Sequence, residues 1–267
     1  MDLESAFAHL DRTYFGPDAY ERDEIAQLPS RLFNCRVFID VGASLGQYTF
    51  YANQIMRDGQ IYAIEADPDR YAVLERRCAE WVQSGTNNIT PVHAAAGDSH
   101  EPITFYVTKS QISGGFFPVS ERSDHYRPIS VEQVTVDDFY EPGAQTFVKI
   151  DVEGAELRVM RGATRHLAGG HTSYLTEITW WGDRERGYTS ADYLRYLRSN
   201  GLQIEKAAGR HNAGYWLTPG GPSGYWRVGP LLVAKSWYGR YFPRRLRLLR
   251  ERTLNRTRTQ KTIGSER

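Results

Sequence analysis

The sequence DVGASLG, residues 40–46, joins an apolar run to a helical pattern and could bind a nucleoside. Gly42 and Gly46 permit positive φ angles and let backbone amides approach a ligand, because neither has a Cβ atom. Glu65 ends the next apolar run, 19 residues after Gly46, and a carboxylate at this spacing accepts hydrogen bonds from ribose hydroxyls. The third glycine of a dinucleotide fingerprint and the Lys-Ser/Thr pair of a phosphate loop are both missing. A ribose contact without a phosphate site indicates S-adenosylmethionine; alternatively, the glycines only permit tight packing.

The sequence FVKIDVEGAE, residues 147–156, brings a second group of ionisable side chains to the end of an expected strand. Lys149 and Asp151 lie on one side of that strand, and Glu153 follows in the turn. Ligands of open parallel sheets bind beyond the carboxyl ends of the strands, so we expect these residues at a ligand site. Glu156 is equally well explained by the dipole at the start of the following helix.

The elements that would position these residues alternate between strands and helices, which predicts a mostly parallel α/β sheet. Strands are expected at residues 37–41, 61–65, 89–95, 147–151, 174–178, 203–206 and 231–235. Helical stripes cover residues 45–55, 71–81 and 159–167, and a further helix covers 190–199. Two more strands, 103–108 and 129–136, form a β insertion at about 99–136.

These passages resemble the FkbM family of S-adenosylmethionine-dependent methyltransferases. The resemblance rests on FIDVGA at 38–43 with Gly46, AIE at 63–65, VDDF at 136–139 and KIDVEGAE at 149–156, and covers about residues 36–180. It implies a class I methyltransferase fold, an α/β, Rossmann-like, seven-stranded and mostly parallel sheet with helices on both faces. The last strand would be antiparallel.

The resemblance also assigns cofactor-binding residues. The methionine end of S-adenosylmethionine would contact Asp40, Gly42, Ala43 and Gly46. Glu65 would bind the ribose and Asp98 the exocyclic amine of adenine; alternatively, Asp98 only forms a turn. Ala66 stands beside the ribose contact, where relatives commonly carry proline.

Methyl transfer to a hydroxyl, which the resemblance implies, needs an aligned acceptor and a group that takes its proton. Asp151 is the first candidate for this base, followed by Glu153 and Glu177, and Lys149 could hold the base ionised or contact the substrate oxygen. The same three carboxylates could instead bind a divalent ion such as Mg²⁺, which would lower the pKa of the hydroxyl.

The remaining segments flank or interrupt a methyltransferase domain of residues 36–238. Residues 1–35 are expected to form an N-terminal helical extension. Residues 209–230 are rich in glycine and contain two Gly-Tyr-Trp triplets, which predicts an aromatic lid. Trp216 and Trp226 of this lid would bind the acceptor, together with the earlier Trp180 and Trp181. The alternative is that these rings plug the edge of the sheet.

Charge and composition narrow the classes of partner. The basic tail, residues 239–267, carries ten Lys or Arg and two Glu, whereas the rest of the chain has an excess of acid. A nucleic-acid-binding protein usually spreads basic surface over its fold, so we expect no nucleic-acid partner. The tail could contact a membrane surface or a phosphorylated carrier, or be a solvated terminus.

No apolar run approaches a transmembrane length, and the first residues, with Asp2 and Glu4, lack the pattern of a signal peptide. We therefore expect a cytoplasmic protein. Its expected function is O-methylation, with S-adenosylmethionine, of a hydroxyl on a carbohydrate or a carbohydrate-containing natural product. Two alternatives stay open: a polyketide, phenol or lipid acceptor, and a non-catalytic binding subunit with a methyltransferase-like fold.

Overall fold

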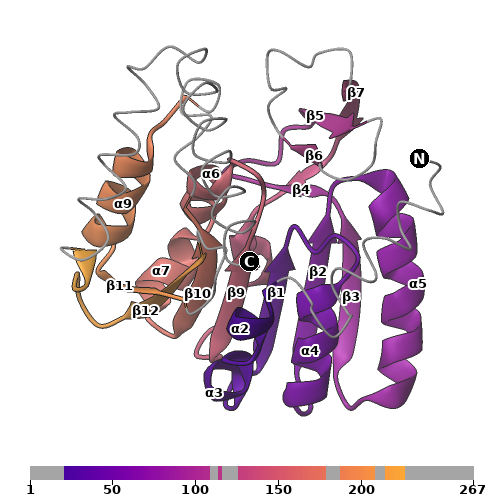
Figure 1. Ribbon diagram of the computed structural model, residues 1–267, viewed down its shortest axis with the longest axis horizontal. Coiled ribbons are helices and arrows are strands. Elements are labelled where there is room, and N and C mark those ends of the chain that lie inside the picture. Colours follow the sequence, from indigo (N-terminus) through magenta and orange to yellow (C-terminus); the bar gives the residue numbers. More distant parts are fainter. Residues whose placement is uncertain (1–20, 109–113, 116–125, 179–186, 208–213, 226–267) are drawn as a thin grey trace, which may run out of the picture.

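A seven-stranded sheet forms the centre of the protein (Figure 1). The computed structural model describes residues 21–108, 114–115, 126–178, 187–207 and 214–225. The strand order is β11-β12-β10-β9-β1-β2-β3. In chain order the strands are β1 (Val37–Val41), β2 (Gln60–Glu65), β3 (Asn88–His93), β9 (Thr146–Ile150), β10 (Thr172–Glu177), β11 (Leu202–Lys206) and β12 (Gly214–Pro219). Only β12 of these runs antiparallel, between β10 and β11. The predicted class I methyltransferase fold is confirmed.

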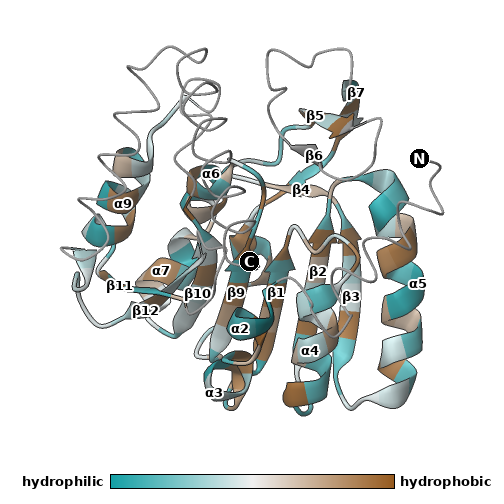
Figure 2. Ribbon diagram, in the orientation of Figure 1, coloured by the Kyte–Doolittle hydropathy of each residue, from teal (hydrophilic) through white to brown (hydrophobic). Residues whose placement is uncertain are grey.

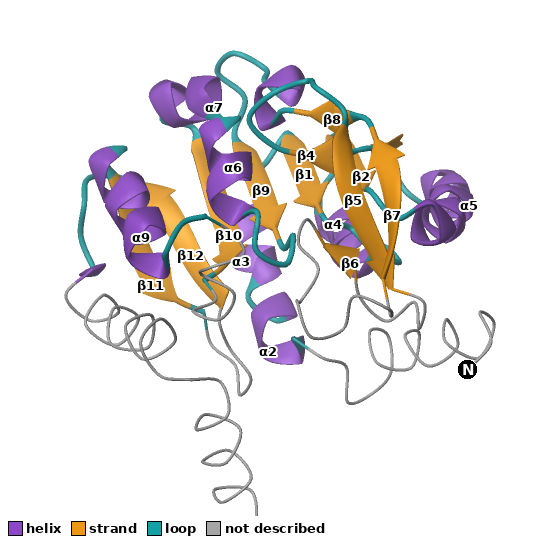
Figure 3. Cartoon of the chain, turned by 90° about the horizontal axis from the view of Figure 1, so that it is seen from above, coloured by secondary structure: helices purple, strands orange, loops and turns teal. Residues whose placement is uncertain are grey.

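Helices cover both faces of this sheet (Figure 3). One face carries α2 (Arg22–Ile25), α3 (Leu28–Leu32), α4 (Gln47–Ile55) and α5 (Pro68–Ser84). The other carries α6 (Glu156–Arg161), α7 (Thr164–Gly169) and α9 (Ser190–Ser199). The helix α5 begins with proline, and Asp67 caps it by accepting hydrogen bonds from the amides of Asp69 and Arg70. None of the described helices is long and apolar enough to cross a lipid bilayer.

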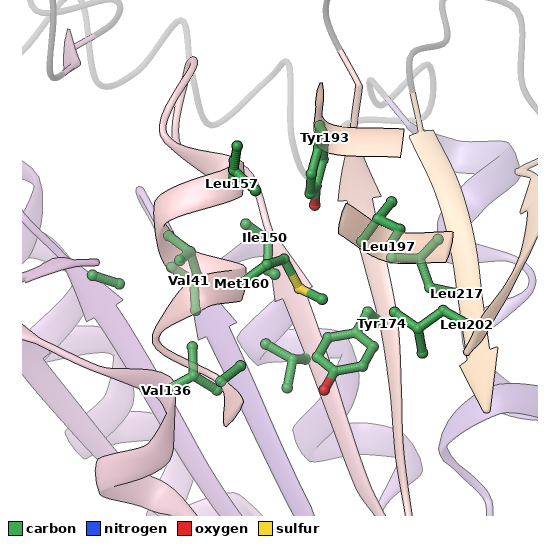
Figure 4. Close-up of a cluster of buried hydrophobic side chains, with 14 of the residues drawn as sticks. Val41, Val136, Ile150, Leu157, Met160, Tyr174, Tyr193, Leu197, Leu202 and Leu217 are labelled. Carbon is green, nitrogen blue, oxygen red and sulfur yellow. The ribbon is translucent and has the colours of Figure 1, made fainter. Parts of the chain in front are cut away.

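The core is divided by the alternation of side chains along the strands. In β1, Ile39 and Val41 face α6 and α9, whereas Phe38 faces α3 and α4 and stacks on Phe147 of β9. Figure 4 shows the larger of these two clusters, to which α9 contributes Leu197. Because β1, β2 and β9 are covered on both faces, they are hydrophobic along most of their length (Figure 2).

The insertion lies beyond the carboxyl ends of β1 to β3 (Figure 1). It contains β5 (Ile103–Thr108), β6 (Gly114–Gly115) and β7 (Tyr126–Val131) in one antiparallel sheet. A separate parallel pair joins β4 (Ala95–Ala96) to β8 (Gln133–Val134). The expected single strand over 129–136 is wrong, because Thr135 and Asp138 form a capping box that starts a 3-10 helix, η2 (Val136–Phe139).

Two other expected elements differ from the structure. The helical pattern over 159–167 is divided into α6 and α7: Gly162 is the C-cap of α6, at a point where a Cβ would collide with the Gly97 carbonyl. Within the segment 209–230, for which the sequence predicts an aromatic lid, residues 214–219 form β12, whose central part is buried between two neighbouring strands. The strand expected at 231–235, the basic tail 239–267 and the first 20 residues lie outside the described ranges.

Candidate active site

The end of β1 brings a buried carboxylate, that of Asp40, to the carboxyl edge of the sheet. Asp40 Oδ2 accepts hydrogen bonds from the Thr49 amide at 3.0 Å and the Thr49 hydroxyl at 2.7 Å. Asp40 Oδ1 is buried and has no hydrogen-bond partner in the described part of the chain; Lys149 Nζ lies 3.5 Å from it. Asp40 therefore fixes the start of α4 and keeps one oxygen atom without a hydrogen bond.

Gly42 and Gly46 both have positive φ angles, +76° and +87°. A Cβ at Gly42 would collide with the Asp151 carbonyl, and a Cβ at Gly46 would lie 2.8 Å from side-chain atoms of Leu74 and Trp81 in α5. Packing alone therefore requires both glycines. Their predicted contact with a cofactor would be additional to this role.

Glu65 occupies the predicted position at the end of β2 and is only 6% exposed. Its Oε2 accepts from the Ser44 amide at 2.7 Å and its Oε1 from the Asp67 amide at 2.8 Å. Burial raises the pKa of Glu65, while Arg70 and these two amides lower it. Each oxygen accepts one of these hydrogen bonds and can accept another from a hydroxyl. The carboxylate therefore fits the ribose of S-adenosylmethionine.

Lys149 of β9 lies opposite Asp40 in the parallel register and is buried beneath the same edge. Its ammonium donates to the Gly42 carbonyl at 3.0 Å and lies 3.6 Å from Asp151 Oδ2. It also lies 5.1 Å from the centre of the Tyr48 ring, close enough for a cation–π contact. The structure thus brings Lys149 and Asp151 together, and the Asp151 side chain keeps 35% exposure.

The turn that follows Asp151 has an unusual backbone. Glu153 has a φ of +52°, a conformation that is rare without glycine, and Gly154 has a φ of +109°. Glu156 supports the turn, since its Oε1 accepts from the Gly154 amide at 2.9 Å and its Oε2 lies 3.0 Å from the Tyr188 hydroxyl. Glu156 is buried in the first turn of α6, as the helix-dipole interpretation predicts.

Carboxylates from several elements interact at this edge. Desolvation raises the pKa of Glu177 to about 9, and Asp151 and Glu153 add to the shift through charge repulsion. Desolvation, followed by Asp151 and Glu156, raises the pKa of Glu153 to about 7. The Glu153 residue is exposed, so solvent screens its charge from these neighbours. The ends of β9 and β10 thus form one electrostatic unit.

Sequence reasoning missed the contribution of α2. Desolvation raises the pKa of Glu21, immediately before α2, to about 8, and Asp151 is the next cause. Glu24 is buried, and its Oε2 accepts a hydrogen bond from the Tyr48 hydroxyl at 3.3 Å. No spacing or motif marks these glutamates, because they reach the site through packing of a separate segment.

Other predicted residues have different surroundings. Asp98 forms an ion pair with Arg158 of α6, with Oδ1 3.5 Å from Nε. Ala43 and Ala66 are buried, and Ala66 packs with the insertion. Across the described ranges, no group of three or more His, Cys, Asp or Glu side chains has a geometry that could hold a metal ion. The Mg²⁺ alternative for Asp151, Glu153 and Glu177 therefore has no structural support in this part of the chain.

The expected lid role of Trp216 is wrong. Trp216 is a residue of β12, only 2% exposed, and its Nε1 donates to Gln27 Oε1 at 3.1 Å. The ring packs against Phe147 and under Arg31 of α3 because its side chain points to the face of the sheet that α3 and α4 cover. Trp180, Trp181 and Trp226 lie outside the described residues.

Comparison with known proteins agrees with this geometry. The sequence model of the methyltransferase FkbM domain matches residues 40–204, which is more than half of the chain. The chain belongs to the FkbM methyltransferase family. Its matched region contains the Asp40 turn, Glu65, and the Lys149–Asp151 pair, whereas α2 lies before it. No curated protein matches this FkbM chain significantly.

Solved structures similar to this FkbM protein are distant in sequence. A methyltransferase FkbM from Methylobacillus flagellatus KT is 17% identical, with a TM-score of 0.48, over 78% of this chain and 47% of that one. This chain thus spans about half the length of the Methylobacillus protein. A precorrin-6y C5,15-methyltransferase from Geobacter metallireducens GS-15 is 15% identical, with a TM-score of 0.44, over 74% and 86%. TrmK from M. capricolum, in complex with S-adenosylhomocysteine, is 10% identical, with a TM-score of 0.41, over 75% and 70%.

Proposed function

We propose that this protein transfers a methyl group from S-adenosylmethionine to a hydroxyl of a carbohydrate or a carbohydrate-containing natural product. The observation that carries the proposal is the common sheet edge shared by the Glu65 carboxylate and the Asp151 carboxylate. The first fits a ribose, and the second has the lysine contact and exposure that suit a proton acceptor. The FkbM domain supplies the reaction class.

Once bound, S-adenosylmethionine supplies an electrophilic methyl group on a sulfonium. The protein then has to orient the acceptor hydroxyl and accept its proton. Asp151 is the proposed base, and Lys149 holds its carboxylate at a distance of 3.6 Å. Glu177, with a pKa of about 9, carries its proton at neutral pH and is therefore a hydrogen-bond donor. Glu153 is the second candidate for the base, because its raised pKa brings it closer to neutrality.

The acids at this edge support a neutral acceptor with several hydroxyls. Asp151, Glu153 and Glu177 can pair with more than one hydroxyl of a sugar, whereas a lipid or macrocycle with a single hydroxyl would leave some of them without a partner. Those of these acids that are ionised would repel the phosphates of a nucleic acid. The free thiols of Cys35 and Cys78 support a cytoplasmic location.

Calorimetric titration with S-adenosylhomocysteine tests the cofactor. The wild-type protein should bind it, and Glu65→Ala should weaken binding by about 1–3 kcal/mol, because a charge-assisted hydrogen bond to the ribose is lost. Glu80→Ala, which removes an exposed glutamate of α5, is the matched control and should bind like the wild type. A wild-type protein that does not bind S-adenosylhomocysteine would contradict the proposal.

Methyl transfer to a panel of free sugars, nucleotide sugars, macrolides, phenols and tRNA tests the acceptor. Product should form with a carbohydrate-containing acceptor, and Asp151→Asn should lower kcat by roughly 10²–10⁴-fold, the effect of losing a general base. Its affinity for S-adenosylhomocysteine should stay close to that of the wild type. If only phenols or tRNA are methylated, the acceptor class is wrong; if Asp151→Asn retains its rate, another group is the base.

A further inference from the structure

Tyr48 connects α2 to the lysine of the candidate site. It is the second residue of α4 and is only 3% exposed. Its hydroxyl donates to Glu24 Oε2 at 3.3 Å and also interacts with the Glu21 carboxyl, and its ring centre lies 5.1 Å from Lys149 Nζ. One buried side chain therefore contacts both an acid from the N-terminal segment and the ammonium between Asp40 and Asp151.

The two contacts of Tyr48 reinforce each other. A phenol that donates a hydrogen bond to a carboxylate gains electron density on its ring, and a more electron-rich ring face attracts an ammonium more strongly. The hydrogen bond to Glu24 also fixes the orientation of the ring. Both effects hold Lys149 in place, and the charge of Lys149 also acts on Glu24 directly, since it lowers the pKa of that carboxyl.

Glu24 is fitted closely into this position. A Cβ at Gly214 would collide with the Glu24 carboxylate, and Gly214 lies opposite Glu177 in the antiparallel register of β10 and β12. Burial raises the pKa of Glu24, and its hydrogen bond with Tyr48 lowers it. A carboxylate buried here costs desolvation energy, which is consistent with a role that needs this group at this place.

We propose that α2 is part of the active site and that Glu24 is a positioning residue, which holds Tyr48 against Lys149 and so keeps the lysine between Asp40 and Asp151. The inference rests on the proposed function in assigning Lys149 to the support of the base. It extends that function to a segment outside residues 40–204, the range that the family shares.

Lysine-selective NMR can observe this contact directly, because the chain has only five lysines. The ε-methylene signal of Lys149, assigned with Lys149→Arg, should lie upfield of the other lysines through the ring current of Tyr48. In Glu24→Leu it should move toward the position of the other lysines. Glu24→Gln keeps a hydrogen-bond acceptor and should retain most of the displacement. Glu205→Gln, which removes an exposed glutamate paired with Arg31 at 3.2 Å, is the control and should not move the signal.

The same variants distinguish a positioning role of Glu24 from an effect on the stability of the fold alone. Lys149 donates to the carbonyl of Gly42, in the turn between β1 and α4 that is proposed to contact the cofactor. Glu24→Leu should therefore weaken S-adenosylhomocysteine binding about 2–10-fold, the contribution of one ordinary hydrogen bond. A lower Tm with an unchanged Lys149 signal would overturn the inference. Should Glu24→Leu not fold, Tyr48→Phe keeps the ring without its hydroxyl and should also move the signal; an unchanged signal would again overturn it. If the wild type binds no S-adenosylhomocysteine but the signal moves, the proposed function fails and the positioning role stands.

Discussion

Glu177 shows how the position of a residue changes its chemistry. The sequence places it at the end of a strand, where it is a candidate base, but desolvation and the neighbouring acids raise its pKa to about 9. A carboxyl group that keeps its proton at neutral pH is a poor base and a good hydrogen-bond donor. Within the same cluster, this difference favours the proposed assignment of the base to Asp151 before Glu177.

The raised pKa of Glu177 predicts a pH dependence of stability. Below about pH 4.5 the folded and unfolded chains both hold this proton; above it the unfolded chain loses the proton, while the folded chain keeps it until about pH 9. The stabilising contribution is therefore complete below the unfolded pKa and is lost as the pH rises toward 9. Between pH 5.5 and 8.5, Glu177→Gln should reduce the fall in the free energy of unfolding, measured with urea. Glu205→Gln is the control, and an equal fall in both variants and the wild type would contradict the assignment.

The sequence predicts the positions of site residues that lie at the ends of strands. It does not predict those that other segments bring to the site. Glu65 and the Lys149–Asp151 pair lie where strand alternation and the carboxyl-edge rule predict. Glu24 and Tyr48 could not be predicted, because their meeting depends on how α2 packs beside α4. The raised pKa of Glu177 could not be predicted either. Its burial and its closeness to Asp151 and Glu153 depend on how separate segments pack.

Among the elements, the contact between the turn that follows β1 and the end of β9 predicts how substitutions of two glycines affect stability. Gly42 and Gly143 have the same φ, +76°, but a Cβ would strike the Asp151 carbonyl at Gly42 and meet nothing within 4 Å at Gly143. Gly143→Ala should therefore cost only the strain of its backbone, of order 1 kcal/mol. Gly42→Ala should cost more and also weaken S-adenosylhomocysteine binding. Equal losses in unfolding experiments on the two variants would show that the collision is relieved easily.

Element boundaries were predicted well where one local signal controls them. The Asp67-Pro68 cap starts α5, and α9 spans the expected residues 190–199. The strand β12 could not be predicted, because the composition of the glycine-rich segment disfavours a strand. Pairing with β10 and β11 on both sides stabilises it. Because of the same composition, the sequence predicts a surface lid for Trp216, although its neighbours bury it.

At the scale of the whole molecule, β12 determines when the fold can be completed. This strand separates β10 from β11, and its Trp216 supplies the hydrogen bond to Gln27 across 189 residues of sequence. A ribosome makes the N-terminal segment first, so the partner of Gln27 does not exist until nearly all of the domain has emerged. During synthesis α2 and α3 therefore emerge before the sheet is complete, and the edge of β10 stays unpaired until β12 has been made. A chain interrupted before residue 214 would lack the strand that closes this edge and the ring against which α2 and α3 pack.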